Sequence, residues 1–410
     1  MMKLLALFLA ICLVSNGAPG QWEPSPVLKG LRLFGQSRAD LPITLLREEP
    51  MTIEFDVQAD KPPRLELRFY HCDREWNTTP TSFVNDEFLN KTRLEIPFEA
   101  SPVGVKGYAY QYSFRIPGHP LFDGFLFSGN YRLEIWDAEL QEELASARFF
   151  VAEQLLQPEI KVINRRDPAT SAPRNQVHLV RVAFAVPPPD SAATMPYFSH
   201  DFTAVDVYKN RELTRPWRVS VDDDDPNTFV EGLATQFLEF RIENIVPGNE
   251  YRTIDLESVN QYPQHMELRP RGGADLSRFP WRRASDKDGS SSIVRGNRYA
   301  EYLDFQFELL WDVVSDSVFV VGDFNGWDPR KGGPMELQDG RYTWKTSVGR
   351  GRYDYQYVVG SDWIALEGND WRTINRYTAL IYYRDPRFGG FDRIVGVART
   401  RSSGGLSEGN

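Results

Sequence analysis

Apolar and polar residues alternate with a period of two along much of the chain, and this alternation restricts the possible folds more than any other feature. The period is typical of a half-buried β-strand, because successive side chains of a strand point to opposite faces of a sheet. The clearest alternating residues are Ile53, Phe55, Val57, Leu65, Leu67, Phe69, Tyr131, Leu133 and Ile135. Turn residues separate the runs, as in IPGHP at 116–120 and SGN at 128–130. The pattern predicts an all-β protein.

The spacing of the strand-like runs predicts tandem β-sandwich domains of the immunoglobulin-like or early-set type. The 410 residues suffice for several domains, since one domain takes about 100–200 residues. Short strands about ten residues apart are typical of a sandwich. The predicted divisions are a first sandwich at 21–154, a second at 155–269, a linker or long loop at 270–298, a third at 299–398 and a disordered tail at 399–410.

The N-terminus predicts export. Lys3 precedes an apolar run over 4–14, and small residues follow up to Gly20. This is the outline of a secretory signal peptide, predicted here at 1–20. The apolar run is shorter than the roughly 20 residues that a membrane-spanning helix needs. We therefore expect an exported protein with no direct membrane span, in which Cys72 is the remaining cysteine and a buried thiol.

Composition and motifs favour no enzyme class. The formal net charge of −10 provides no basic field for nucleic acid. The sequence has no GxSxG elbow, no HExxH motif and no paired-cysteine spacing. His71 and Cys72 are neighbours in a strand-like run, so their side chains point to opposite faces and cannot form a base–thiol pair. We expect no catalytic residue, no metal site and no cofactor.

One local motif could bind a ligand. VFVVGDFNGWDPR at 318–330 predicts a strand, a tight turn and a large aromatic side chain at Trp327. Aromatic faces can stack on sugars, and the amide of Asn325 could bond to hydroxyl groups. Tryptophan is also a core residue of small sandwiches. The residues alone leave both interpretations open.

The stretch 318–363 resembles the carbohydrate-binding modules of glycogen-branching enzymes and AMP-activated kinase β-subunits. GDFNGWD is similar to the Gly-x-Phe-Asn-x-Trp turn of these modules, and GRGRYDYQYVVGSDW at 349–363 is similar to their hairpin. The resemblance implies that their sugar-stacking tryptophans fall on Trp327 and Trp363. Their sugar-holding lysine falls on Gln356, which has no charge. The candidate ligand or interface residues are Asn325, Trp327, Gln356, Trp363 and Trp371.

A longer series of motifs extends over nearly the whole mature chain. The series is FYHCDREWNTTPTSFVNDEFLN (69–90), FSGNYRLEIWD (127–137), RFFVAE (148–153), PGNEYRTIDLES (247–258), GDFNGWD (322–328), GRYDYQY (351–357), EGNDWRTINRYTALIYYRD (367–385) and FDRIVG (391–396). In this order the motifs resemble the plug protein family of the type IX secretion system of Bacteroidota-type bacteria. The segment 270–298 departs from the family pattern.

The second resemblance implies a periplasmic, non-enzymatic protein. Its partner would be the very large outer-membrane barrel of the type IX translocon, whose periplasmic opening it would close when no cargo is exported. The main alternative is a secreted glucan-binding protein that uses Trp327 and Trp363. A secreted hydrolase lacks an identifiable catalytic set, and a cargo protein of the same system would normally end in a dedicated sorting domain.

Overall fold

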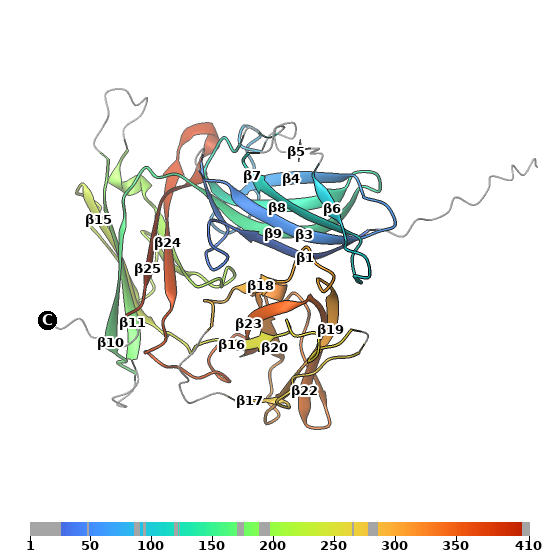
Figure 1. The fold of residues 1–410 in the computed structure, drawn as a ribbon. Coiled ribbons are helices and arrows are strands. Elements are labelled where there is room, and N and C mark those ends of the chain that lie inside the picture. Colours follow the sequence, from blue (N-terminus) through green and yellow to red (C-terminus); the bar gives the residue numbers. More distant parts are fainter. Residues whose placement is uncertain are drawn as a thin grey trace, which may run out of the picture.

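The computed structural model describes residues 26–46, 49–85, 91–92, 96–118, 122, 124–169, 176–187, 197–264, 266–277 and 286–403. Strands dominate these residues, and the prediction of an all-β fold with several sandwiches is confirmed. Figure 1 shows three lobes of strands packed around a common centre. The predicted signal peptide at 1–20 lies outside the described residues.

The first lobe, sandwich one, forms from the N-terminal third of the chain. One of its sheets has the order β1 (Val27–Phe34), β3 (Met51–Gln58), β7 (Tyr110–Ile116) and β6 (Phe98–Ala100). Facing it are β9 (Glu142–Ala152), β8 (Gly129–Asp137), β4 (Leu65–Cys72) and β5 (Lys91–Thr92). The alternating residues Phe55, Phe69 and Leu133 lie in the core between the sheets. The apolar residues that alternate with a period of two therefore lie on the buried face of each strand, as expected.

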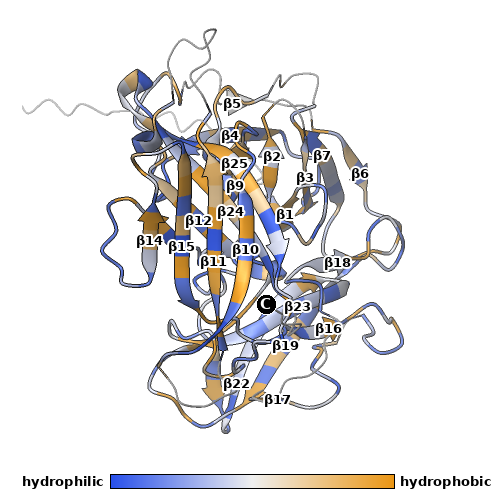
Figure 2. Cartoon of the chain, turned by 90° about the vertical axis from the view of Figure 1, so that its left-hand side faces the viewer, coloured by the Kyte–Doolittle hydropathy of each residue, from blue (hydrophilic) through white to orange (hydrophobic). Residues whose placement is uncertain are grey.

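The second lobe, sandwich two, repeats this construction. One sheet has the order β10 (Glu159–Arg166), β11 (Gln176–Ala185), β15 (Phe237–Ile245) and β14 (Thr228–Glu231). Facing it are β13 (Trp217–Ser220), β12 (Ala204–Lys209), β24 (Arg376–Asp385) and β25 (Phe391–Arg401). Figure 2 shows alternating hydrophilic and hydrophobic bands along β11 and β15.

A single nine-stranded sheet joins sandwiches one and two. It runs β13-β12-β24-β25-β9-β8-β4-β5, and β2 (Ile43–Leu45) pairs with β9 beside this path. The join is the parallel pairing of β25 with β9 at Ile394 and Ala152. A further apolar cluster that includes Cys72, Phe150 and Tyr382 covers this region. The two sandwiches thus share a continuous hydrogen-bonded layer.

The third lobe, sandwich three, contains the GDFNGW motif. One sheet contains β16 (Arg252–Asp255), β23 (Gly351–Val359), β18 (Ser291–Ile293) and β20 (Val318–Gly322). The other has the order β17 (Asp275–Leu276), β19 (Tyr302–Leu310), β22 (Arg341–Gly349) and β21 (Glu336–Gln338). Three short 3-10 helices complete the described elements: η1 (Ser199–Asp201), η2 (Asp323–Asn325) and η3 (Arg387–Gly389). None of the helices described is long and apolar enough to cross a membrane.

The strand pairing differs from the predicted consecutive domains. β16, expected in the second sandwich, and β17 and β18, expected in the linker 270–298, all pair within sandwich three. β24 and most of β25, expected in the third sandwich, pair instead with β12 and β9. The reason lies in β24, which is apolar on both faces: Ala379 and Ile381 face the core of sandwich two, and Leu380 and Tyr382 face the cluster around Cys72. A central strand covered on both sides buries such a run.

The predicted disordered tail also begins later than expected. β25 continues to Arg401, whose partner in the ladder is Arg376. The Ser402 hydroxyl then donates a 2.9 Å hydrogen bond to the carbonyl of Thr373 and accepts one of 2.9 Å from the backbone N–H of Asn375. Residues 404–410 lie outside the described part.

Candidate functional site

The GDFNGW motif folds into a turn whose polar groups bond to one another. β20 ends at Gly322, η2 follows, and Gly326 has a φ of 65°. The Asn325 side chain accepts a 3.0 Å hydrogen bond from the Gly322 N–H and donates to the carbonyls of Val320 and Lys331 at 3.0 and 3.2 Å. The Asn325 amide, which the sequence suggested as a partner for sugar hydroxyl groups, therefore stabilises the turn instead.

Trp327 is a buried residue. Its side chain is 1% exposed, its indole N–H donates a 2.9 Å hydrogen bond to the Gly289 carbonyl, and its ring lies 4.4 Å from that of Tyr251. A Cβ on Gly289, where φ is +82°, would lie 3.0 Å from the indole, so the close approach requires glycine. Trp327 and Trp363, which is 8% exposed, belong to one buried cluster.

A segment of sandwich two covers this face of sandwich three. The Thr214 hydroxyl donates a 3.0 Å hydrogen bond to the carbonyl of Trp327, and the Arg215 guanidinium lies 5.4 Å from the centre of the Trp363 ring. The segment 209–215 therefore lies where the resemblance to carbohydrate-binding modules predicted an exposed stacking surface. This surface is therefore an internal contact between sandwiches two and three.

The other candidate residues do not open this face. Gln356 is 5% exposed and donates a long 3.5 Å hydrogen bond to the Trp363 carbonyl. Trp371 is partly buried and is not a member of the cluster that holds Trp327 and Trp363. The structure thus brings Trp327 and Trp363 together, but the pair offers no free ring face for stacking.

Arg211 joins all three sandwiches at the same place. Its side chain extends from the end of β12, and its Nε donates a 3.1 Å hydrogen bond to Asp323 in the GDFNGW turn. Its Nη1 donates to the carbonyls of Arg38 and Asp40 at 2.9 and 2.5 Å, and its Nη2 donates to the Leu33 carbonyl at 3.2 Å. Sequence reasoning missed Arg211, because its partners are far away in the chain and no local motif marks it.

Further polar contacts connect sandwich one to its neighbours. Toward sandwich three, the Tyr302 hydroxyl donates a 2.9 Å hydrogen bond to Asp56, and Arg295 lies 3.2 Å from the same carboxylate. Toward sandwich two, Arg74 forms a 2.7 Å ion pair with Asp206. Burial raises the pKa of Asp206 to about 6 despite the opposing effects of Arg74 and Arg218. These carboxylates are held at interfaces and are shielded from solvent.

The loop before β18 connects sandwiches two and three. Asp288 pairs with Arg376, at 3.3 Å, and with Arg401. Asp354 accepts hydrogen bonds from the backbone N–H groups of Lys287 and Gly289 at 2.6 and 3.1 Å. Burial raises the pKa of the Asp354 carboxyl to about 7. This loop lies within 270–298, the segment that departs from the plug-family pattern.

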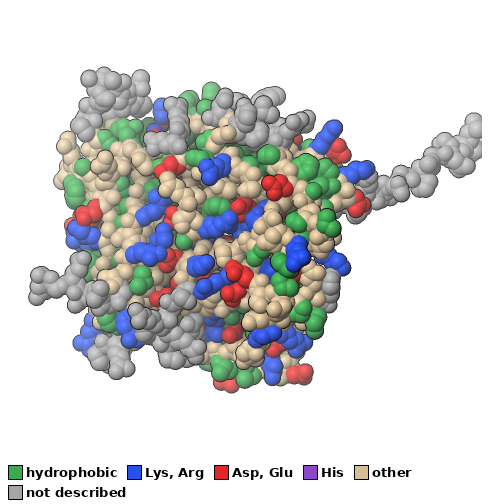
Figure 3. All heavy atoms as spheres, viewed as in Figure 1, with side chains coloured by type: hydrophobic (Ala, Val, Ile, Leu, Met, Phe, Trp, Pro, Cys, Tyr) green, Lys and Arg blue, Asp and Glu red, His purple; other side chains and the backbone are tan. Residues whose placement is uncertain are grey.

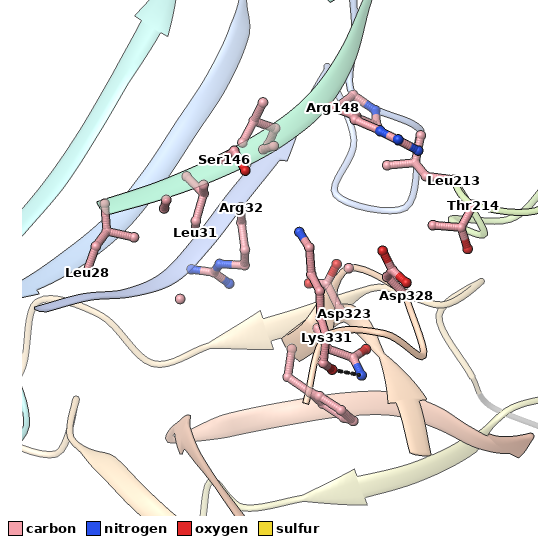
Figure 4. Close-up of a pocket in the computed structure, with 18 of the residues that line it drawn as sticks. Leu28, Leu31, Arg32, Ser146, Arg148, Leu213, Thr214, Asp323, Asp328 and Lys331 are labelled. Atoms are coloured by element: carbon pink, nitrogen blue, oxygen red, sulfur yellow. Dashed lines mark hydrogen bonds between the residues drawn. The ribbon is translucent and has the colours of Figure 1, made fainter. Parts of the chain in front are cut away.

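A cavity of about 610 Å³ lies beside Arg211, where the three sandwiches meet; we call it the junction cavity. It is lined by Leu28, Gly30, Leu31, Arg32, Leu33, Pro42, Arg132, Glu143, Leu144, Ala145, Ser146, Ala147, Arg148, Arg211, Leu213, Thr214, Asp323, Phe324, Asn325, Gly326, Asp328, Arg330 and Lys331. Figure 4 shows side chains from β1, β9 and the GDFNGW region around one space. Figure 3 shows cationic and anionic side chains gathered near the middle of the molecule, where the lobes meet.

The remaining sequence candidates are structural. His71 and Cys72 are both buried on β4, and burial lowers the pKa of His71 to about 4 and raises that of Cys72 to about 11. The His71 Nδ1 lies 2.8 Å from the Thr79 hydroxyl, whereas Cys72 lies in the apolar cluster of the shared sheet. Among the described residues, no group of three or more His, Cys, Asp or Glu side chains could hold a metal ion.

Fold and junction together define a multidomain β-sandwich protein whose domains are fixed to one another by a shared sheet and by buried polar contacts. Residues 28–153 match the family model described as "Type 9 secretion system plug protein 1st domain". The match runs from β1 through β9, which is sandwich one. The predicted resemblance to the type IX plug family is therefore confirmed over this span. The resemblance of the third domain to carbohydrate-binding modules stays a prediction.

One solved structure shares the fold over almost its whole length. It is a hypothetical protein from Parabacteroides merdae ATCC 43184, which is 20% identical, with a TM-score of 0.73 over 92% of this chain and 98% of that chain. At this identity the likeness concerns the fold alone. No curated protein matches the chain. The plug-domain match indicates a role in type IX secretion, an envelope location and contact with a secretion translocon.

Proposed function

We propose that this chain is the periplasmic plug of the type IX translocon. It docks on the giant outer-membrane barrel and closes the periplasmic opening of the barrel when no cargo is exported. The observation that carries the proposal is the match of residues 28–153 to the first domain of the plug family. An exported, non-enzymatic protein without a cofactor fits this role, because closing a pore needs shape and stiffness and no chemistry.

The way the sandwiches are joined supports the proposal. A body that closes a wide pore has to keep its shape under contact with the barrel. Here the shared nine-stranded sheet joins sandwiches one and two. Arg211 extends from sandwich two and donates hydrogen bonds to groups in sandwiches one and three. Inter-domain contacts within one chain are commonly polar and permit relative motion. Buried contacts such as Arg74–Asp206 and Tyr302–Asp56 restrict that motion.

Affinity purification from outer membranes tests the proposal. We expect the tagged full-length chain to recover the giant barrel after mild detergent extraction, whereas an unrelated periplasmic protein with the same tag does not. We also expect a strain that lacks the chain to admit a large antibiotic that the outer membrane normally excludes. Failure to recover the barrel, together with unchanged permeability, would contradict the plug function.

Glucan binding, the alternative, is tested separately. Trp327 and Trp363 are buried against Tyr251 and the segment 209–215, so we expect the wild-type protein to pass through insoluble glucan without retention. Retention that is lost in Trp363→Ala, with the fold intact by circular dichroism, would favour the glucan-binding alternative.

A further inference from the structure

The junction cavity contains more cationic groups than its own carboxylates neutralise. Its lining includes three carboxylates, and two of these are already engaged. Asp323 accepts hydrogen bonds from Arg211 and Ser291, and Asp328 forms a two-pronged pair with Arg330 at 2.9 Å on each side. The third, Glu143, is exposed. The cations that face the cavity therefore depend on other partners.

Arg32 is the clearest case. Its residue is 6% exposed, and only its Nη2 has an acceptor, the Glu54 carboxylate at 2.9 Å. Within the described part of the chain, no group accepts a hydrogen bond from its Nε or Nη1. Buried donors without acceptors are costly, and they are rare in folded proteins. Nε and Nη1 have almost no accessible surface, so the guanidinium favours an oxyanion in the cavity through its positive charge.

Arg148 and Lys331 add two more cations. Neither of them forms an ion pair with any residue that the structure describes, and the Arg148 guanidinium lies over the Trp76 ring at 4.7 Å. Burial lowers the pKa of Lys331, and the charges of Arg148 and Arg330 lower it further against the opposing effect of Asp328. Figure 4 shows Arg32, Arg148 and Lys331 around the same space, from β1, from β9 and from the segment after η2.

Part of the remaining lining is apolar. Leu28 and Leu31 on β1, Leu144 on β9 and Leu213 contribute hydrocarbon surface next to the cations. A volume of about 610 Å³ exceeds what an inorganic ion needs and lies in the usual range of about 300–1,000 Å³ for small-molecule sites. The lining therefore combines a cationic end with an apolar wall.

We propose that the junction cavity binds a small organic anion, with a carboxylate or phosphate group between Arg32, Arg148 and Lys331 and an apolar part against β1 and β9. The ligand would bridge sandwiches one and three, because Arg32 and Arg148 belong to sandwich one and Lys331 to sandwich three, and Leu213 of sandwich two lines the same cavity. Its binding would therefore favour the closed arrangement of the sandwiches over any looser one. The proposal does not depend on the plug function.

Isothermal titration calorimetry on the full-length protein tests this site with four probes: octanoate, octyl phosphate, inorganic phosphate and octyl glucoside below its micelle concentration. We expect saturable one-to-one binding of octanoate or octyl phosphate, at least tenfold weaker binding of inorganic phosphate and none of octyl glucoside. Equal binding of octyl glucoside, or no saturable binding of either octyl anion, would overturn the proposal. Equal affinity for inorganic phosphate and octyl phosphate would overturn the apolar part of it.

Matched variants locate the site. We expect Lys331→Met and Arg148→Met each to weaken the better octyl anion at least tenfold, whereas Lys161→Met, on the exposed surface of β10, leaves its affinity unchanged. Lys331→Met removes an exposed charge that has no ion-pair partner among the described residues, so its thermal midpoint without ligand should not fall below that of the wild type. Unchanged affinity in both cavity variants would overturn the proposed location.

Discussion

Single residues at the junction bury polar and aromatic groups that would otherwise be expected at a surface. Trp327 has its indole N–H bonded to Gly289 and its ring against Tyr251. Arg350, in the stretch 349–363 that resembles the hairpin of carbohydrate-binding modules, is fully buried and pairs with Glu301. Each of these groups is satisfied by a partner far away in the sequence, so the role of the residue depends on the assembled fold.

Truncation of Trp327 should destabilise the protein strongly. We expect Trp327→Ala to lower the free energy of unfolding by about 3–5 kcal/mol, because it removes a large buried side chain and leaves a cavity. Phe83→Ala is the matched control, since this aromatic residue is 68% exposed, and its effect should stay within about 0.5 kcal/mol. Urea denaturation measures both. A small effect of Trp327→Ala would mean that the indole is on the surface in solution.

Asp354 should make stability depend on pH. Burial raises its pKa from 3.8 to about 7, so the folded protein keeps this proton to a higher pH than the unfolded chain does. The contribution of Asp354 to the free energy of unfolding should therefore fall as the pH rises from about 4 to about 7, by at most about 1.4 kcal/mol per pH unit for one proton. We expect the difference in the free energy of unfolding between wild type and Asp354→Asn to change with pH by this amount in urea titrations, whereas the difference between wild type and Asp304→Asn, at an exposed position on β19, does not.

At the scale of elements, the position of β24 and β25 decides how the chain is divided. Both strands follow sandwich three in the sequence, but they complete the sheet of sandwich two and reach β9 of sandwich one. Sandwich two therefore closes only when the end of the chain has returned to it. This return also holds sandwich three between two segments that are anchored elsewhere.

Hydrogen exchange should reveal this division. We expect Leu309→Ala, in the core of sandwich three, to accelerate amide exchange in β19, β22 and β23, which belong to that sandwich. Amides of β24 and β25 should keep their protection, because their ladders are with β12 and with each other. Val207→Ala, in the core of sandwich two, should do the reverse. Loss of protection in β24 together with β23 after Leu309→Ala would contradict the observed pairing.

At the scale of the whole molecule, rigidity comes from a combination of a shared sheet and a polar junction. The sheet joins sandwiches one and two through the backbone, whereas no described strand of sandwich three forms a ladder with either of them. Its position depends on side chains, above all Arg211 and the pairs of Asp56 and Asp288. Sandwich three is therefore the part of the molecule that a junction variant should release.

Removal of the Arg211 guanidinium should loosen the assembly. In Arg211→Met the carbonyls of Leu33, Arg38 and Asp40 and the carboxylate of Asp323 lose their shared donor. We expect a larger radius of gyration in small-angle X-ray scattering than for the wild type. Arg181→Met, at an exposed position on β11, should leave the scattering profile unchanged. An unchanged profile for Arg211→Met would mean that other contacts suffice to hold sandwich three.

Much of the fold follows from the sequence, because strand period and turn chemistry are local properties. The alternating residues at 53–57, 65–69 and 131–135 lie on buried faces of β3, β4 and β8. The strand at 318–321 and the turn after it are also as predicted. The assignment of the candidate ligand or interface residues stays a prediction, since a turn motif that resembles a sugar-binding one does not reveal whether another part of the chain covers it.

The sequence by itself determined the strand content, the sandwich class and the match of residues 28–153 to the model of the plug family's first domain. Only the tertiary structure decided which strands share a sheet, that the segment 209–215 covers Trp327 and Trp363, and that cations from three sandwiches meet in one cavity. The physical reason is the range of the interactions. Side-chain alternation is fixed by neighbouring residues, whereas burial and charge pairing depend on residues that meet only after the chain has folded.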